Sequence, residues 1–278
     1  MKKSFVIVLL MCMVLTVSAQ FTFRSIKEPE QGVDCGKIAF MFTYNYRYVE
    51  DVDHRPYFFK DDRMLLEVGD RMSRFWSLSQ FQTDSINAER KKQGENNFLG
   101  NGKIVWQLYR NCPEQGEYVY LDELGMDRFS YVEKVVFPHW DIEEDSVIVL
   151  LGYTCRKATA DYCGRRWSVW YTDDIPLDEG PWKLKGLPGM ILKASDSEGQ
   201  FVFEAIGMQQ NVTERNLVYI GNGYERIGKP DFLKTCRHYY ADPIGYITTK
   251  PDVKVTVTDE KGNPLPNPKD QPYNLLER

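Results

Sequence analysis

Histidine is scarce in this chain, whose 278 residues contain three, His54, His139 and His238. None lies four residues from another, and the His-Glu-x-x-His, Cys-x-x-Cys and Asp-x-Asp-x-Asp-Gly patterns of metal sites do not occur. The closest Cys–His pair in sequence is Cys236 and His238, which on a helix would point to different faces. The sequence therefore gives little support for a metal site, a cofactor or a cysteine hydrolase.

Other catalytic and nucleic-acid signatures are also missing. No Gly-x-Ser-x-Gly elbow and no phosphate-cradling glycine loop is present. The formal net charge of −5 at pH 7 argues against nucleic acid as a partner and against electrostatic attachment to an anionic surface.

Long apolar runs are confined to the first residues. Lys2 and Lys3 precede an apolar stretch over residues 5–17, and Val17-Ser18-Ala19 places small residues before Gln20. This pattern predicts a signal peptide over residues 1–19, and no later stretch is long and apolar enough to cross a bilayer. We expect an exported protein that is periplasmic, outer-membrane-associated or secreted, without a transmembrane segment in the mature chain.

Cysteine is sparse, and its count is odd once the leader is excluded. The five candidates for disulfides are Cys35, Cys112, Cys155, Cys163 and Cys236. An oxidising compartment permits disulfides, but an odd count leaves at least one thiol free or paired with another molecule. If one strand carries Cys155 and Cys163, they lie about 26 Å apart and cannot bond. The sequence leaves the connectivity open.

Alternation of aromatic and other residues is the strongest pattern present. Aromatic or apolar side chains occupy every second position from Ile38 to Tyr48, which predicts a strand with one aromatic face. The members of the candidate apolar face are Phe40, Phe42, Tyr44 and Tyr46. This face either lines the core, the commoner outcome for a sheet, or lines a cavity for an apolar ligand.

Strand patterns recur along the rest of the chain between Gly- and Asp-rich turns. They cover residues 64–68, 71–76, 103–110, 117–121, 129–137, 147–158, 167–172, 190–194, 200–208 and 253–258. Residues 147–158 are predicted to form one long strand, and the polar residues 80–97 a loop or short surface helix. The fold class expected is mainly β (α+β), with a curved antiparallel meander sheet similar to the half-barrel of lipoprotein carriers. One domain would cover residues 20–260, and residues 261–278 would form an extended Pro-rich tail.

One helix is predicted near the C-terminus. Pro230 suits a first helical turn, and Pro243 lies just past the expected end. Apolar side chains recur at three- and four-residue steps at Phe232, Leu233, Cys236, Tyr239 and Tyr240. This stripe is expected to pack on the sheet.

Residues 167–190 combine strand signals, turn residues and aromatics more densely than any other stretch. In Gly186-Leu187-Pro188-Gly189, Pro188 suits the second position of a type II turn, and Gly189 would take the positive φ of the third. The segment is either a rigid hairpin or a rim that grips a ligand or partner. The candidate rim residues are Trp170, Tyr171, Ile175, Pro176, Gly180, Pro181, Trp182, Gly186, Leu187, Pro188 and Gly189.

The hexapeptide Gly186-Leu187-Pro188-Gly189-Met190-Ile191 resembles the signature of the GLPGLI family of secreted Bacteroidetes-type proteins. The resemblance extends to Leu151–Ala158, Trp170–Pro176, Gly180-Pro181, Asp242–Tyr246 and Pro272-Tyr273-Asn274. It implies an exported envelope protein whose family has no established biochemical activity, with outer-membrane uptake or assembly proteins as neighbours.

Two functional classes follow from these patterns. The first is a non-enzymatic binding or assembly protein for an apolar ligand, a lipid, a peptide or an outer-membrane partner. The alternative is an exported hydrolase that uses carboxylates near Asp173, Asp174 and Asp178. Because Asp is also favoured in solvated turns for local backbone bonding, the binding role is the preferred interpretation.

Overall fold

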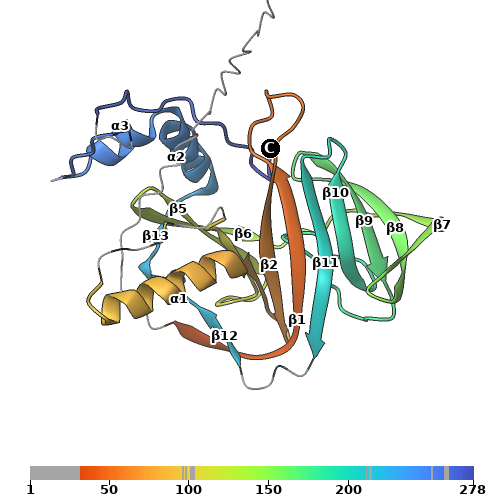
Figure 1. Cartoon of the computed structure of the whole chain (residues 1–278). Coiled ribbons are helices and arrows are strands. Elements are labelled where there is room, and N and C mark those ends of the chain that lie inside the picture. The colour runs from red at the N-terminus through yellow and green to blue at the C-terminus, as the bar shows by residue number, and fades with distance from the viewer. Residues whose placement is uncertain are drawn as a thin grey trace, which may run out of the picture.

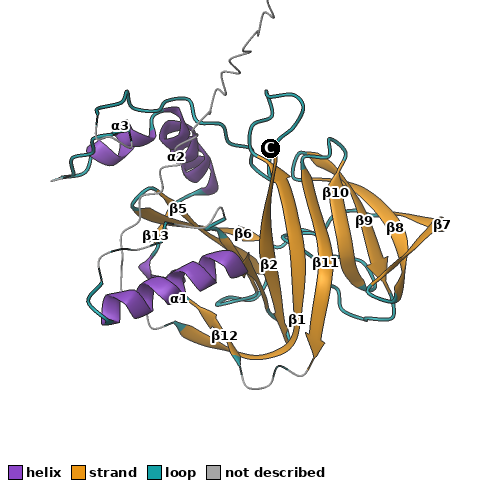
Figure 2. Ribbon diagram, viewed as in Figure 1, coloured by secondary structure: helices purple, strands orange, loops and turns teal. Residues whose placement is uncertain are grey.

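A computed structural model describes residues 32–278, apart from residues 96, 98, 101–103, 211, 213–214, 252 and 260–262. The predicted leader over residues 1–19 lies outside the described residues. The described chain forms one large sheet with helices beside it (Figures 1 and 2).

The strands are β1 (Val33–Val49), β2 (Phe59–Gly69), β3 (Ser73–Ser77), β4 (Gln107–Arg110), β5 (Glu117–Leu124), β6 (Asp127–Lys134), β7 (Asp141–Leu150), β8 (Tyr153–Tyr162), β9 (Arg165–Thr172), β10 (Met190–Asp196), β11 (Phe201–Gln210), β12 (Asn216–Tyr219) and β13 (Glu225–Arg226). The helices are α1 (Leu78–Lys92), α2 (Lys229–Ala241) and α3 (Pro243–Thr248), with a 3-10 turn η1 (Gly221–Gly223).

The sheet consists of two antiparallel meanders that meet at β1. Its order is β13-β6-β5-β4-β3-β2-β1-β11-β10-β9-β8-β7, and β12 pairs with β1 off this path. Within each meander consecutive strands are neighbours, as the turn spacing predicts. The short β13 pairs with β6 in parallel, so the sheet is mixed, and it is not closed.

Strand β1 is the centre of the sheet because its 17 residues pair with β2 on one side and β11 on the other. Because successive side chains of a pleated strand point to opposite faces, alternate residues of β1 differ in burial. Phe42, Tyr44 and Tyr46 are buried, whereas Arg47 on the opposite face is exposed. The Tyr44 hydroxyl donates a hydrogen bond across the sheet to the carbonyl of Ile191 in β10.

The segment 80–97 was expected as a loop or short surface helix, and most of it belongs to the 15-residue helix α1, Leu78–Lys92. The Ser77 side chain caps it by accepting a hydrogen bond from the Gln80 N–H, and basic residues occupy its last turn. Its few buried side chains are polar: Asn87 donates to and accepts from the backbone of Leu99. The sequence signal for a surface helix is an apolar stripe, and α1 lacks one because its contacts are polar. For this reason the length of the helix was not predicted.

Helix α2 begins and ends close to the predicted positions. Phe232 and Cys236 are buried, and Leu233, Tyr239 and Tyr240 are partly buried against the core. Pro243 does lie beyond its end, but a further helix, α3, begins there because the Asp242 carboxylate caps it by accepting from the Gly245 N–H. No helix of the described residues has the length and apolarity needed to span a membrane.

Two strand predictions were wrong. Residues 147–158 form parts of a hairpin, β7 and β8, because Leu151 and Gly152 both adopt positive φ, at 51° and 86°. The dipeptide Leu-Gly is a much weaker sequence signal for such a turn than Asn-Gly or Asp-Gly. Residues 253–257 are not a strand despite their alternating valines; near them only a single bridge joins Thr258 and Pro264 among the described residues.

The predicted type II turn was also wrong, although both glycines are required. Gly186, not Gly189, has a positive φ, of 94°. Gly189 is needed for a close approach, because a Cβ there would lie 2.0 Å from the carbonyl oxygen of Thr172.

The structure pairs Cys35 with Cys112, which joins the start of β1 to the β4–β5 connection. Cys155, Cys163 and Cys236 are free. Cys155 lies on β8 and Cys163 directly after that strand, so they cannot bond to each other, in agreement with the distance argument.

Candidate functional site

An aromatic cavity lies between the sheet, helix α2 and the C-terminal segment. Its volume is about 120 Å³. Nine aromatic side chains line it: Tyr46, Tyr48, Trp106, Tyr120, Tyr131, Trp182, Phe232, Tyr240 and Tyr273. The other lining residues are Glu50, Ile104, Val105, Asp122, Glu123, Leu233, Asn274, Leu275, Leu276 and Glu277. An aromatic hollow of this kind is typical of sites for small ligands.

The ring wall of this cavity is continuous. Trp106 stacks on Tyr120 with ring centroids 5.9 Å apart, and Tyr120 stacks on Tyr131 at 4.9 Å. Phe232 of α2 closes over Tyr120 and Tyr131 at 5.7 and 5.3 Å. Tyr46 of β1 meets Trp106 edge-on. The helix stripe therefore packs on the sheet as predicted, and it completes the wall at the same time.

Four carboxylates belong to the lining, and three of them form ion pairs. The pairs are Glu50 with Lys60, Glu123 with Arg128, and Glu277 with Lys183 and Lys229. Asp122 differs, because its partners are neutral donors: the Tyr120 hydroxyl at 3.2 Å and the Glu123 backbone N–H at 2.8 Å. No basic side chain of the described residues pairs with Asp122.

Burial raises the pKa of the Asp122 carboxyl from 3.8 to about 7, although the two hydrogen bonds oppose the shift. A carboxyl that titrates near neutral pH inside an aromatic hollow is a recognised mark of a functional site.

Tyr48 adds a second unusual polar group to the lining. Its side chain is 5% exposed, and its hydroxyl is buried without a hydrogen-bond partner among the described residues. Buried hydroxyls are usually satisfied, because desolvation without a partner costs about 1–3 kcal/mol. Tyr48 is therefore a lining residue whose hydroxyl has an unused donor and acceptor.

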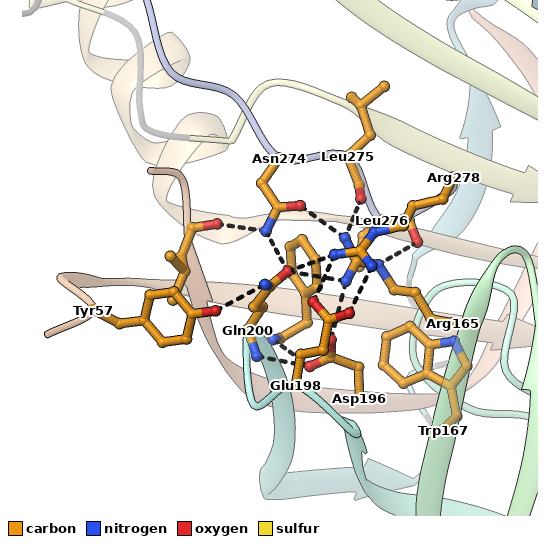
Figure 3. Close-up of polar contacts among 12 residues, drawn as sticks. Tyr57, Arg165, Trp167, Asp196, Glu198, Gln200, Asn274, Leu275, Leu276 and Arg278 are labelled. Carbon is orange, nitrogen blue, oxygen red and sulfur yellow. Dashed lines mark hydrogen bonds and ion pairs between the residues drawn. The ribbon is translucent and has the colours of Figure 1, made fainter. Parts of the chain in front are cut away.

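Arg165 holds the C-terminal segment in place as one wall of the cavity (Figure 3). Its guanidinium donates to the carbonyl oxygens of Leu275 and Leu276 at 2.8 and 3.1 Å, and to Asn274 Oδ1 at 2.7 Å. It also pairs with Asp196 at 3.0 Å, and both side chains are 1% exposed. The segment expected as an extended tail thus contributes five residues, 273–277, to the cavity lining.

A second charged cluster anchors the same wall. The ammonium of Lys183, 1% exposed, contacts the carboxylates of Glu277 and Glu133, and Lys229 of α2 contacts the same two carboxylates. These contacts lower the pKa of Glu133 and raise that of Lys229. The cluster therefore ties β6, α2 and the C-terminal segment together.

The structure places the candidate rim mostly inside the protein. Tyr171 is fully buried, and Ile175, Trp182 and Leu187 are also buried. Gly180, Pro181 and Gly189 are buried as well, Trp170 is half-buried, and Pro176, Gly186 and Pro188 are exposed. Of these residues only Trp182 lines the cavity.

The apolar face of β1 divides between core and cavity. Phe42 and Tyr44 are fully buried, and Phe40 packs half-buried against the core. Tyr46 stacks on Phe203 with centroids 4.5 Å apart, and it also reaches the cavity.

Of the carboxylates considered for hydrolysis, those of Asp173 and Asp178 have local partners. Asp173 pairs with Arg156, Asp178 accepts from the Gly186 N–H and pairs with Lys185, and the Asp174 N–H donates to the Thr172 hydroxyl. All three aspartates are exposed and none lines the cavity. Nothing in this arrangement favours the hydrolase. Within the described ranges, no three His, Cys, Asp or Glu side chains gather as metal ligands.

Trp106, Tyr120, Asp122 and Tyr131 were missed by the sequence reasoning. The signal that could have found them is the even-numbered series Tyr118, Tyr120 and Asp122 on β5, where a carboxylate continues an aromatic face. The position of α2 over that face could not be predicted from local pattern.

Residues 164–193 match a family model described as "Protein of unknown function (Porph_ging)". The matched span holds Arg165, Trp182, Lys183 and the Gly186–Ile191 hexapeptide. No curated protein is significantly similar to the chain. Among solved structures, PNGF-II in its P21 and C2 crystal forms aligns at 14% and 15% identity, with TM-scores of 0.48 and 0.45. These alignments cover 73% and 72% of this chain and 34% and 32% of the PNGF-II chains, so the chain spans about a third of the length of those structures.

Proposed function

We propose that this chain is a GLPGLI-type exported envelope protein that binds a small, largely apolar ligand in its aromatic cavity without catalysing a reaction. The observation that carries the proposal is the cavity of about 120 Å³ with nine aromatic side chains in its lining. An apolar cavity of about 150 Å³ accepts a molecule the size of benzene, so this hollow suits a small ligand or the end of a larger one.

Native mass spectrometry on the unreduced protein purified from the envelope tests this function. The expected result is extra mass that solvent extraction removes. Val105 is the position for a blocking variant, because it lines the cavity without a charge. Val105→Trp should lose the extra mass, whereas Val149→Trp should keep it, because Val149 is 67% exposed on β7.

A neutral probe extends the test to protein that has lost its ligand. We expect 3,3-dimethylbutan-1-ol to change the fluorescence of Trp106 and Trp182 saturably in the wild type and in Val149→Trp, but not in Val105→Trp. A wild-type spectrum without extra mass, together with no saturable probe response, would overturn the proposal.

We also propose outer-membrane uptake or assembly proteins as partners, which the resemblance to GLPGLI proteins supports. Crosslinking in intact cells, followed by identification of the trapped envelope proteins, tests this part separately. Export itself is tested by the mass of the purified chain, which should lack residues 1–19.

A further inference from the structure

We infer that the ligand of the aromatic cavity carries an organic cation, a quaternary ammonium or protonated amine, which lies against the Asp122 carboxylate and the rings of Trp106 and Tyr120. This inference rests on the proposed binding function and specifies the chemical class of the ligand.

The ring wall supplies the first argument. Aromatic faces attract cations within about 6 Å of the ring centroid, most strongly for Trp and Tyr. Trp106 and Tyr120 both line the hollow, with ring centroids 5.9 Å apart, so a cation there lies close to both rings. Tyr131 already has the ammonium groups of Lys183 and Lys229 at 5.7 and 5.8 Å from its ring centroid. Recognition of quaternary ammonium groups uses aromatic enclosures of this kind.

The charge distribution supplies the second argument. The other three carboxylates of the lining already have basic partners, whereas Asp122 accepts only from the Tyr120 hydroxyl and the Glu123 N–H. Asp122 is half-buried, and a carboxylate partly removed from water without a counter-charge is costly. A cationic ligand supplies that charge, an anionic ligand would be repelled, and a neutral ligand would leave the carboxylate uncompensated.

Asp122 is also the group that titrates in the cavity near neutral pH. The titratable groups facing it are Tyr120 and Glu123 on its own strand, Tyr131 on β6, and Cys236, Tyr239 and Tyr240 on α2. Burial raises the pKa of every one of these tyrosines and of Cys236, so they stay neutral, and Glu123 is paired with Arg128. A cation should therefore bind more weakly as the pH falls below about 7.

The experiment compares two probes of nearly the same shape, choline and its neutral analogue 3,3-dimethylbutan-1-ol, titrated by calorimetry and tryptophan fluorescence. At pH 8 choline should bind about tenfold more tightly than the alcohol. Asp122→Asn should abolish this preference, so that choline and the alcohol bind the variant with similar affinities. The matched control is Asp70→Asn, because the Asp70 side chain is 98% exposed, and it should behave as the wild type.

A second readout follows from proton linkage. The preference for choline should shrink between pH 8 and pH 5.5 in the wild type and show no pH dependence in Asp122→Asn. Equal affinities for the two probes at pH 8 would overturn the cation inference and leave the proposed binding function intact. Failure of both probes to bind would overturn the cation inference, and together with a native spectrum without extra mass it would also overturn the proposed binding function.

Discussion

The Asp122 carboxyl makes the stability of the fold depend on pH in a defined direction. Its pKa in the folded protein is about 7, above the ordinary value of 3.8. Between these values the folded state holds a proton that the unfolded chain has released, so stability falls as pH rises through this window. Below pH 4 the group is protonated in both states and contributes nothing. The difference between these two pKa values sets an upper bound of about 4 kcal/mol on the stability that the folded protein loses above pH 7.

Asp122→Asn should therefore stabilise the ligand-free protein at pH 8, by about 2–4 kcal/mol, because an amide carries no charge to desolvate. The gain should disappear as the pH approaches 4. Urea unfolding of both proteins between pH 4 and pH 8 measures this, with Asp70→Asn as the control. A gain that is independent of pH would mean that Asp122 is not the titrating group.

Gly189 permits a close approach of two backbones within the GLPGLI-like hexapeptide. A Cβ at this position would lie 2.0 Å from the Thr172 carbonyl oxygen, so the β9–β10 connection would have to shift. Gly189→Ala should destabilise the fold by about 1–3 kcal/mol. In contrast, a Cβ at Gly207 on β11 meets nothing within 4 Å, and Gly207→Ala should change stability by less than about 0.5 kcal/mol. Similar midpoints in urea for the two variants would contradict this assignment.

At the scale of elements, the C-terminal segment that lines the cavity is held in position by Arg165 of β9. Arg165 and Asp196 are each 1% exposed, and Arg165 also binds the backbone of Leu275 and Leu276. Arg165→Met leaves Asp196 buried without its counter-charge and should cost about 3–5 kcal/mol. It should also release the C-terminal wall of the cavity and weaken binding of the alcohol probe.

The neighbouring Arg166 is a matched control. It pairs with Asp161, but these side chains are 53% and 77% exposed. Arg166→Met should therefore cost less than about 1 kcal/mol and leave probe binding unchanged. Thermal unfolding, together with proteolysis of the C-terminal segment, distinguishes the two variants. Equal losses for Arg165→Met and Arg166→Met would show that the buried pair does not anchor the segment.

The elements also differ in how far local pattern determined them. The aromatic stripe of α2 predicted its position in the chain and its contact with the sheet. The helix α1 was not predicted at its full length, because polar contacts such as Asn87 with the Leu99 backbone hold it. The β7–β8 hairpin was missed since Leu151 takes a conformation, φ 51°, that leucine rarely adopts.

At the scale of the whole molecule, the Cys35–Cys112 disulfide joins residues 77 positions apart and ties β1 to the β4–β5 connection. A closed loop of this length restricts the unfolded chain, and its removal typically costs about 2–4 kcal/mol. The Cys35→Ser/Cys112→Ser double variant should unfold at lower urea than the wild type. Reductant should lower the midpoint of the wild type to that of the variant, and it should not affect the variant. A wild type insensitive to reductant would contradict this contribution.

The sequence by itself determined most strands of the two meanders, apart from the β7–β8 hairpin, and also the aromatic face of β1 and the stripe of α2. The reason is that side-chain periodicity follows directly from the pleat and the helical turn. It did not determine which thiols pair, which glycine takes positive φ, or which aromatic side chains enclose a cavity. Those features depend on residues far apart in the chain. Asp122 continues the alternation of Tyr118 and Tyr120 on β5, but it became a candidate binding group only when α2 and residues 273–277 came to lie around the same cavity. Burial, which raises its pKa, is a property of that assembly rather than of the surrounding sequence.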